Sequence, residues 1–406
     1  MAGDDGNKGG EARRERLLWV LSAATFFIFF QAYMVAPLIP RLSDIFGVSG
    51  QTIGLIVPAY MIPYGVSTLF YGLLSDRLGR RPILFASLLA FVVLTALTAT
   101  AQSATQMITW RLLTGLGASG VVPLALTLMA DLYPYEQRGR PLGWLFGAMA
   151  GGMAFGSTVG VVLEPYVGWR MLFLGVAVAA GLVLVLLTRY GSLLVGTAAR
   201  SPLSSGEVLA GYRDLLSSGR GIRTYAYVFL NAVFHSGVFT WLGLYFTDRY
   251  SLGEVGIGLA LLGYGVPGFL LGPLLGRAAD RWGRRWLIPA GLGIASASAF
   301  LLVPQAPLLG AVLAVTLLSL GYDMTQPLLA GIVTALGGKR GGQAMGLNVF
   351  ALFTGFGLGS FLFGEALRLG FPLALGIFAS VQLAAGLAAI PLFRSEAVRP
   401  FRPDDG

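Results

Sequence analysis

The chain alternates long apolar stretches with short segments rich in charged residues and glycine. Most apolar stretches hold about 20 residues, the length that an α-helix needs to cross roughly 30 Å of hydrocarbon. The pattern therefore predicts an all-α integral membrane protein with twelve transmembrane helices. The predicted spans cover residues 17–39, 51–74, 82–102, 106–131, 141–163, 170–190, 222–247, 255–275, 286–303, 308–335, 343–365 and 372–393.

Composition supports this class: 55% of the residues are hydrophobic, 12% are charged, and the mean hydropathy is +0.74. Soluble proteins carry roughly 25% charged residues. The chain has no cysteine, which excludes disulfides, thiol catalysis and cysteine metal sites. Its net charge of +9 does not indicate nucleic-acid binding, because the basic residues lie in the short segments between predicted spans.

The distribution of basic residues predicts the topology. If the N terminus is cytoplasmic, 23 of the 28 Lys and Arg residues fall in cytoplasmic segments. Because positive residues are retained inside, we expect both termini in the cytoplasm and the protein in the cell's inner (plasma) membrane. The remaining basic residues are Arg41, Arg170, Arg249 and Arg368 outside, and Arg111 within a span.

One long connection divides the spans into two groups of six. It contains Ser204-x-x-Glu207, typical of a capping box, followed by apolar residues at helical spacing. We expect a short amphipathic helix on the inner membrane surface, with a plain linker as the alternative. The glycine-rich start, Met1 to Glu15, is expected to be disordered. The predicted parts are a cytoplasmic tail (1–16), an N-terminal bundle (17–190), a cytoplasmic linker (191–221), a C-terminal bundle (222–393) and a cytoplasmic tail (394–406).

A charged decapeptide occurs twice, with its copies 204 positions apart. Residues 72–81 and 276–285 both read Gly-x-x-x-Asp-Arg-x-Gly-Arg-Arg. A repeat that halves the chain predicts two copies of one structural unit, as in many transporters. We expect Gly79 and Gly283 to form the tight turn of each loop. The same offset pairs Tyr60 with Tyr264 and Pro63 with Pro267.

The repeated decapeptide resembles the signature loop of the major facilitator superfamily, which joins the second and third helices of each half. The resemblance covers nearly the whole chain and implies two pseudo-symmetric six-helix bundles. It also implies a charge cluster that gates the cytoplasmic side, here Asp76, Arg80 and Asp131. Ala335 stands where a second acid would complete the other cluster. The predicted gate residues are Gly72, Asp76, Arg77, Arg80, Asp131, Gly276, Asp280 and Arg284, although the arginines could simply fix the topology.

Two further motifs resemble the antiporter branch of this superfamily. Arg111-x-x-x-Gly115 resembles its fourth-helix motif, where the arginine is linked to proton coupling; a snorkelling arginine is the alternative. In the fifth span, Gly147, Gly156 and Gly160 match the antiporter motif. The match ends there, since Val161 replaces a proline and Glu164-Pro165 replaces the final glycine pair. Gly152-x-x-x-Gly156-x-x-x-Gly160 is also a small-residue ridge for close helix packing.

Ionisable residues inside predicted spans are functional candidates, because they are costly in hydrocarbon. Asp323 lies about 15 residues into its span, on one helical face with Thr316, Ser319 and Gln326. A carboxyl so deep favours its neutral form, which suits a group that loads and releases a proton. His235, the single histidine, lies mid-span with Asn231 one turn away. Both Asp323 and His235 could instead make structural hydrogen bonds.

The fold implied by the resemblance lines a central cavity with the first, fourth, seventh and tenth helices. Proton coupling is assigned to Asp323, with Arg111 and His235 shaping its proton affinity. Tyrosines of the second span could equally be packing residues. The predicted substrate contacts are Gln31, Tyr33, Tyr60, Asn231, Tyr264 and Gln326.

These features predict a monomeric transporter that exports small organic, partly apolar compounds by proton antiport, with no cofactor and the proton as coupling ion. A proton-independent facilitator or symporter of sugars or metabolites, or a lipid flippase, would use the same fold. An intramembrane enzyme is disfavoured, because no converging catalytic groups are found. A nucleotide-binding P-loop is also missing, which argues against an ATP-driven pump.

Overall fold

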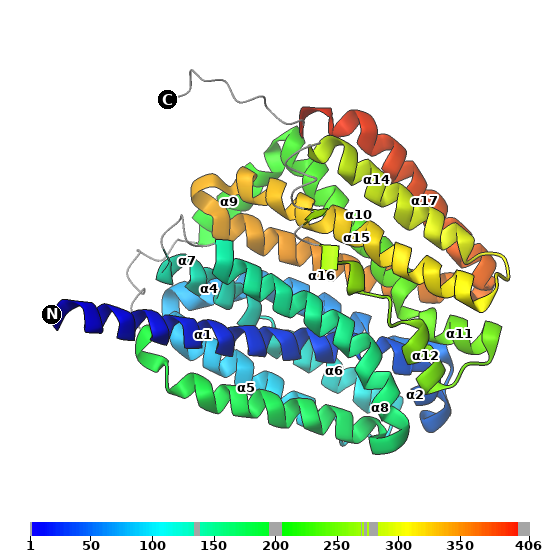
Figure 1. Cartoon of the computed structure of the whole chain (residues 1–406), viewed down its shortest axis with the longest axis horizontal. Helices are drawn as coiled ribbons and strands as arrows, with labels where there is room; N and C mark the ends of the chain where they lie inside the picture. Colours follow the sequence, from blue (N-terminus) through cyan, green and yellow to red (C-terminus); the bar gives the residue numbers. More distant parts are fainter. Residues whose placement is uncertain are drawn as a thin grey trace.

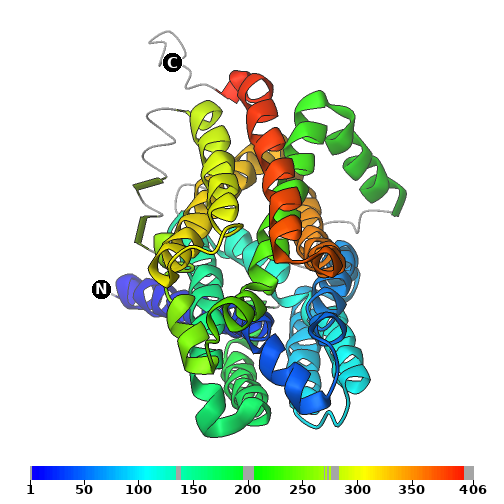
Figure 2. The same ribbon diagram turned by 90° about the vertical axis from the view of Figure 1, so that its right-hand side faces the viewer.

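The computed structural model describes residues 2–133, 139–194, 205–268, 270–271, 274–275 and 283–396. All regular structure in these ranges is helical, and the helices run roughly along one direction (Figure 1). Figure 2 shows the N-terminal helices, coloured blue to green, on one side and the yellow to red C-terminal helices on the other. The expected all-α membrane fold is confirmed. We call residues up to 194 the N-terminal half and residues from 205 the C-terminal half.

The N-terminal half begins with a helix where we expected a disordered tail. The helix α1 starts at Ala2, because the run Glu11 to Arg16 consists of good helix formers that continue into the apolar span. The helices of this half are α1 (Ala2–Tyr33), η1 (Ala36–Leu38), α2 (Ile39–Phe46), α3 (Gly50–Gly54), α4 (Pro58–Leu78), α5 (Arg80–Thr98), α6 (Ala104–Ala118), α7 (Val121–Leu132), α8 (Gly139–Thr188) and η3 (Gly191–Leu194).

The C-terminal half begins within the predicted linker, where Ser204 of the expected capping box lies outside the described residues. Its first helix packs on α10 and α16. The helices are α9 (Ser205–Ser217), α10 (Gly219–Thr240), α11 (Leu242–Tyr250), α12 (Glu254–Ala260), α14 (Arg284–Leu301), α15 (Leu308–Gly337), η4 (Gly338–Arg340), α16 (Gly341–Ala366), η5 (Leu367–Leu369), α17 (Phe371–Leu392) and η6 (Arg394–Glu396).

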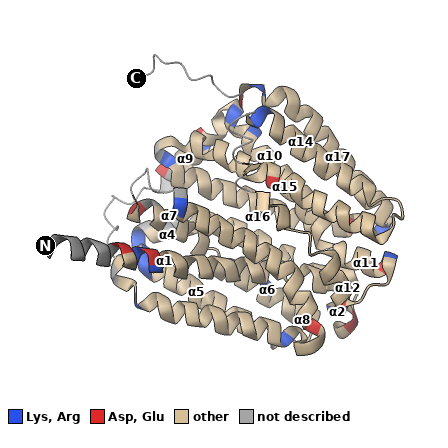
Figure 3. Ribbon diagram, in the orientation of Figure 1, with Lys and Arg blue, Asp and Glu red and all other residues tan. Residues whose placement is uncertain are grey.

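Nine segments of the described ranges are long and apolar enough to cross a membrane. One of them, Arg140–Thr188, contains both the fifth and the sixth predicted spans, which meet at Gly168 with φ of 77°. The ninth predicted span corresponds to α14, which is not among the nine, and the eighth lies partly outside the described residues. The count of twelve spans stays a prediction. Figure 3 shows charged residues gathered mainly at the two ends of the helices.

The predicted glycine ridge of the fifth span packs against α1. A Cβ on Gly152 would lie 2.5 Å from the carbonyl oxygen of Phe26, and one on Gly156 would lie 2.5 Å from that of Phe30. The two backbones therefore approach too closely for any larger residue at these positions. The turn glycines of the repeated loop also behave as expected: Gly79 and Gly283 have φ of 88° and 79°.

The seam between the halves is formed mainly by two pairs of helices: α4 packs on α16, and α8 packs on α12. Near the middle of the first pair, Tyr64 stacks on Phe353 with ring centroids 4.2 Å apart. Gly65 and Gly357 lie in the same seam, where a Cβ would approach Thr354 Oγ1 to 2.8 Å and Ile62 Cγ1 to 2.4 Å. The seam is thus tightly packed.

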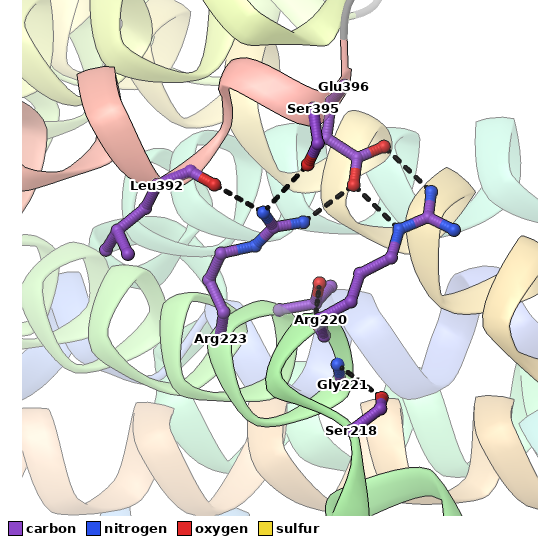
Figure 4. Close-up of polar contacts among 8 residues, drawn as sticks. Ser218, Arg220, Gly221, Arg223, Leu392, Ser395 and Glu396 are labelled. Carbon is purple, nitrogen blue, oxygen red and sulfur yellow. Dashed lines mark hydrogen bonds and ion pairs between the residues drawn. The ribbon is translucent and has the colours of Figure 1, made fainter.

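A buried carboxylate joins the start of α10 to the end of the C-terminal half (Figure 4). Arg220 donates to Glu396 from Nε at 2.7 Å and from Nη2 at 2.8 Å, and Arg223 Nη2 donates at 2.6 Å. Only 4% of the Glu396 side chain is exposed. Arg223 also bonds the Leu392 carbonyl and lies 4.4 Å over the Phe393 ring. We call Arg220, Arg223 and Glu396 the C-terminal clasp.

The two ends of the molecule are named by their contents. The terminal end carries α9 and the C-terminal clasp, and the opposite end carries α2 and α11 (Figure 1).

Candidate functional site

In the N-terminal half, Arg111 is the centre of a buried polar cluster. This arginine of α6 is fully buried; its Nε donates to the Ile56 carbonyl at 3.2 Å and its Nη1 to Gln31 Oε1 at 2.6 Å. Its guanidinium carbon lies 4.2 Å from the ring centroid of Tyr60. Ile56 lies in the turn between α3 and α4, so its carbonyl accepts from a side chain. The arginine is therefore held inside the bundle and does not snorkel to the surface.

In the C-terminal half, an imidazole takes the central place. His235 of α10 is 2% exposed, and its Nε2 is hydrogen-bonded to the Tyr264 hydroxyl. Tyr322 of α15 stacks on the imidazole with ring centroids 3.8 Å apart. Nδ1 of His235 has no hydrogen-bond partner among the described residues. The imidazole is thus fixed on one side by a phenol and retains one free nitrogen.

The two clusters occupy the same register of the repeat. Gln31 and His235 are 204 positions apart, as are Tyr60 and Tyr264. In both halves the first residue lies in the first predicted span of its half, and the second lies in or near a break of the next span. The two clusters therefore use residues at equivalent positions of the repeat. Arg111 has no counterpart in the C-terminal half, because Val315 stands at its repeat position.

Asp323 lies beside a break in a helix of the C-terminal half. α12 ends at Ala260, the backbone turns through Gly265 with φ of 81°, and helical structure resumes at Val266. Gly265 N–H donates to Ser319 Oγ at 2.9 Å, Ser319 Oγ donates to Asp323 Oδ2 at 3.1 Å, and Gly268 N–H also donates to the carboxylate. Broken helices are typical of transporter ion and substrate sites.

Gly268 lies directly against the Asp323 side chain. A Cβ there would lie 2.6 Å from Asp323 Oδ1, and the carboxylate therefore occupies the space of a side chain. The phenols of Tyr33, Tyr264 and Tyr322 lie within electrostatic range of this acid. Asp323 thus faces the interior of the protein, between a broken backbone and tyrosines.

Tyr33 brings the N-terminal half to this acid. Its ring centroid lies 5.4 Å from that of Phe239 and 6.3 Å from that of Phe356, both in the C-terminal half. Among the described residues, the buried Tyr33 hydroxyl has no hydrogen-bond partner, and neither do the two amide atoms of Gln326. Since buried polar groups are normally satisfied, these atoms are suited to bind a substrate.

Asn231 lies in a different environment from the other predicted substrate contacts. Its Nδ2 donates to Thr325 Oγ1 at 2.8 Å, and its Oδ1 accepts from Gln382 Nε2 at 3.1 Å. These bonds join α10, α15 and α17, and the three side chains are buried. The geometry favours a packing role for Asn231.

The predicted gate is described in part. Arg80 and Asp131, two members of the predicted cluster, form an ion pair, and Arg77 is exposed. Arg284 lies against Gly331 of α15, and its Nε is buried without a hydrogen-bond partner among the described residues. Gly72 falls in α4, but its surroundings and the side chain of Asp76 lie outside the described part of the chain, as do Gly276 and Asp280.

Several residues of the site were missed by sequence reasoning. Gly265, Gly268 and Tyr322 have no motif of their own, and Ser319 was placed only on the face of Asp323. The signal for the broken helix was the sequence Gly263-Tyr-Gly-Val-Pro-Gly268, because glycine and proline in an apolar span indicate a break. The residues facing Asp323 require the tertiary fold.

These helices and clusters define a membrane transporter built from two related halves, with polar groups buried at mid-length. The sequence model described as "Major Facilitator Superfamily" matches residues 21–360 and 229–405. The chain therefore belongs to the major facilitator superfamily, as the repeated loop indicated. It is a transporter and not an enzyme.

Relatives and solved structures agree with this assignment. The chain is 26% identical over 350 residues to the uncharacterised MFS-type transporter YceJ of Bacillus subtilis, covering 86% of this chain and 88% of the relative. It is 28% identical over 279 residues to a chloramphenicol resistance protein of Streptomyces lividans, covering 68% and 69%. A structure of a D-xylose-proton symporter superposes with a TM-score of 0.73 at 18% identity, covering 93% of this chain and 96% of that one.

Proposed function

We propose that this transporter exports small organic, partly apolar compounds in exchange for protons, and that Asp323 carries the proton. The observation that supports this most is the position of the carboxylate, between Ser319 Oγ at 3.1 Å and the backbone of a broken helix. Such an acid, which is only partly exposed, offers one ionisable group to an interior site. With the terminal end assigned to the cytoplasm, protons enter from the opposite side.

Export by exchange requires that protonation and substrate binding disfavour each other. Asp323 serves this purpose if the substrate binds beside the carboxylate and is released when the acid is protonated. Aromatic rings surround the site: Tyr264 lies 4.3 Å from Phe239, and Tyr322 lies 6.2 Å from Phe356, between ring centroids. These faces suit the apolar part of a substrate, and Gln326 and Tyr33 suit its polar part.

The names of several relatives support this substrate class. The chain resembles chloramphenicol resistance proteins of Pseudomonas aeruginosa and Streptomyces lividans, and over a shorter stretch a quinidine resistance protein of Saccharomyces cerevisiae. Chloramphenicol and quinidine both combine an aromatic ring with polar groups. We therefore assign the substrate to uncharged or weakly basic aromatic compounds.

Reconstitution of Asp323→Asn in proteoliposomes tests the proposal. We expect pH-gradient-driven uptake of an aromatic probe such as chloramphenicol to disappear, because asparagine keeps the volume but cannot exchange a proton. Asp44→Asn, a substitution of an exposed aspartate in α2, is the matched control and keeps transport. Uptake that persists in Asp323→Asn overturns the assignment of the proton carrier. Wild-type uptake that ignores an imposed pH gradient instead favours a proton-independent facilitator.

A further inference from the structure

At the opposite end of the molecule, the two halves meet through glycines. A Cβ on Gly243 of α11 would lie 3.0 Å from the Pro37 carbonyl oxygen, and one on Gly258 of α12 would lie 2.3 Å from Val162 Cγ2. Pro37 and Val162 belong to the N-terminal half, whereas both glycines belong to the C-terminal half. This end is therefore closed, with no room for a side chain between the halves at these points.

Trp241 lies in this closed end, between α10 and α11, and is 2% exposed. Its indole fills the space of two missing side chains: a Cβ on Gly54 of α3 would lie 2.3 Å from Cη2, and one on Gly364 of α16 would lie 2.5 Å from Cζ2. Its Nε1 donates to the Ser360 carbonyl at 3.0 Å. Ser360 and Gly364 are in the same half as Trp241, whereas Gly54 is in the other.

Arg41 also contacts one residue in its own half and one in the other half. Its Nε lies 3.4 Å from Glu164 Oε1 and 3.6 Å from Glu254 Oε1. Glu164 belongs to α8 of the same half, whereas Glu254 begins α12 of the other half. Exposed fractions of the Arg41, Glu164 and Glu254 side chains are 45%, 2% and 30%.

Ion pairs at the terminal end have a different arrangement. The pairs Arg80–Asp131 and Arg140–Glu15 join partners within the N-terminal half. The pairs Arg340–Asp214 and Arg220–Glu396 join partners within the C-terminal half. These four pairs can therefore persist when the halves separate at the terminal end, whereas separation at the opposite end breaks the contact of Arg41 with Glu254.

We propose that Arg41, Glu254 and Trp241 form the gate that closes the end opposite the termini, with Gly54 as the seat of the indole. Arg41 and Trp241 each have one partner in their own half and one across the seam, and Glu254 is the partner of Arg41 across it. On opening, Arg41 keeps Glu164 and leaves Glu254, while Trp241 keeps the Ser360 carbonyl and leaves Gly54. Both side chains therefore keep one partner and stay ordered in the open state. Closing the gate then costs little side-chain conformational entropy. The proposal requires alternating access but not proton coupling.

Distance measurements between two spin labels test this gate in the full-length protein in lipid nanodiscs. The chain has no native cysteine, so Ile45→Cys and Val255→Cys give one label on each half at the opposite end. Both side chains are exposed, at 40% and 37%. We expect a dominant short distance in the parent and a larger long-distance population when the gate is weakened.

Two variants weaken the gate by different routes. Glu254→Gln removes a partly exposed ion pair and should raise the ratio of open to closed molecules about two- to threefold. Gly54→Leu removes the seat of the indole and should move most molecules to the long distance. Glu365→Gln is the matched control, because its pair with Arg368, at 3.1 Å, lies within one half at the same end.

The gate is refuted if Glu254→Gln and Gly54→Leu both keep the parent's distance distribution, or if Glu365→Gln changes it as much as Glu254→Gln does. These measurements do not depend on a proton gradient. Loss of the proton-antiport assignment would therefore leave this inference untouched, and loss of the gate would leave that assignment untouched.

Discussion

The C-terminal clasp gives a prediction whose size follows from its geometry. Glu396 accepts three charge-assisted hydrogen bonds of 2.6 to 2.8 Å, and its side chain is 4% exposed. Glu396→Gln keeps the shape but removes the charge, leaving Arg220 and Arg223 without a carboxylate. Hydrogen bonds to charged groups contribute roughly 1.5–3 kcal/mol each, but Arg220 is 44% exposed and water can replace its partner. We therefore expect Glu396→Gln to lower the free energy of unfolding by about 2 kcal/mol.

The effect should depend on pH with a defined sign. Burial alone would raise the pKa of Glu396, but hydrogen bonds and charge from Arg220 and Arg223 hold this pKa below its ordinary value. A carboxyl with a lowered pKa stabilises the folded state above its unfolded pKa of about 4.3. This stabilisation is lost as the pH falls through the lower folded value. The difference between wild type and Glu396→Gln should therefore be full at neutral pH and vanish in acid.

Thermal unfolding of the purified protein in detergent, followed by intrinsic fluorescence at several pH values, measures this difference. Asp214→Asn is the matched control, because its pair with Arg340 has both side chains more than half exposed, at 62% and 52%. We expect that control to change stability by roughly 0–1 kcal/mol. The reasoning is refuted if Glu396→Gln has the same unfolding temperature as the wild type at neutral pH, or if Glu396→Gln and Asp214→Asn change the unfolding temperature equally.

Two other substitutions test the packing of the N-terminal half by the same unfolding assay. Gly152→Leu should destabilise the protein by about 1–3 kcal/mol or more, because its Cβ would lie 2.5 Å from the Phe26 carbonyl oxygen. Gly147→Leu is the control and should be near neutral, because no atom of the described residues lies within 4 Å of the position that its Cβ would take. Equal effects would contradict the close contact of α1 with α8. Arg111→Lys should lower the free energy of unfolding by about 3 kcal/mol. A lysine ammonium cannot reproduce a guanidinium that donates hydrogen bonds to two acceptors and lies over the Tyr60 ring. Wild-type stability of this lysine variant would show that the second donor contributes nothing.

Much of the fold could be predicted from the sequence, because a membrane imposes simple rules on it. Runs of apolar residues predicted the helices, and the repeated decapeptide predicted two related halves. The turns at Gly79 and Gly283 followed from the charged loop alone, since φ near 80° favours glycine. The α1 extension was missed because low hydrophobicity was taken as disorder, although Glu11 to Arg16 favours a helix.

The ionisable residues of the site could be predicted one by one from the sequence, but the groups that contact them could not. Ionisable groups in apolar spans stand out, so Arg111, His235 and Asp323 were found. Their partners are ordinary residues, such as the carbonyl of Ile56 and the amide of Gly268, which any sequence offers in hundreds of copies. Which of these face an ionisable group depends on where helices break and cross.

The shared register of Gln31 and His235 bears on how this transporter arose. If one ancestral segment was duplicated, both copies began with the same residue at this position, and the later exchange gave one copy a permanently neutral amide and the other a titratable ring. In that ancestor the two halves would have carried the same residue at this position. In this protein the two halves differ, because a fixed cation, Arg111, lies in one and an ionisable acid, Asp323, lies in the other.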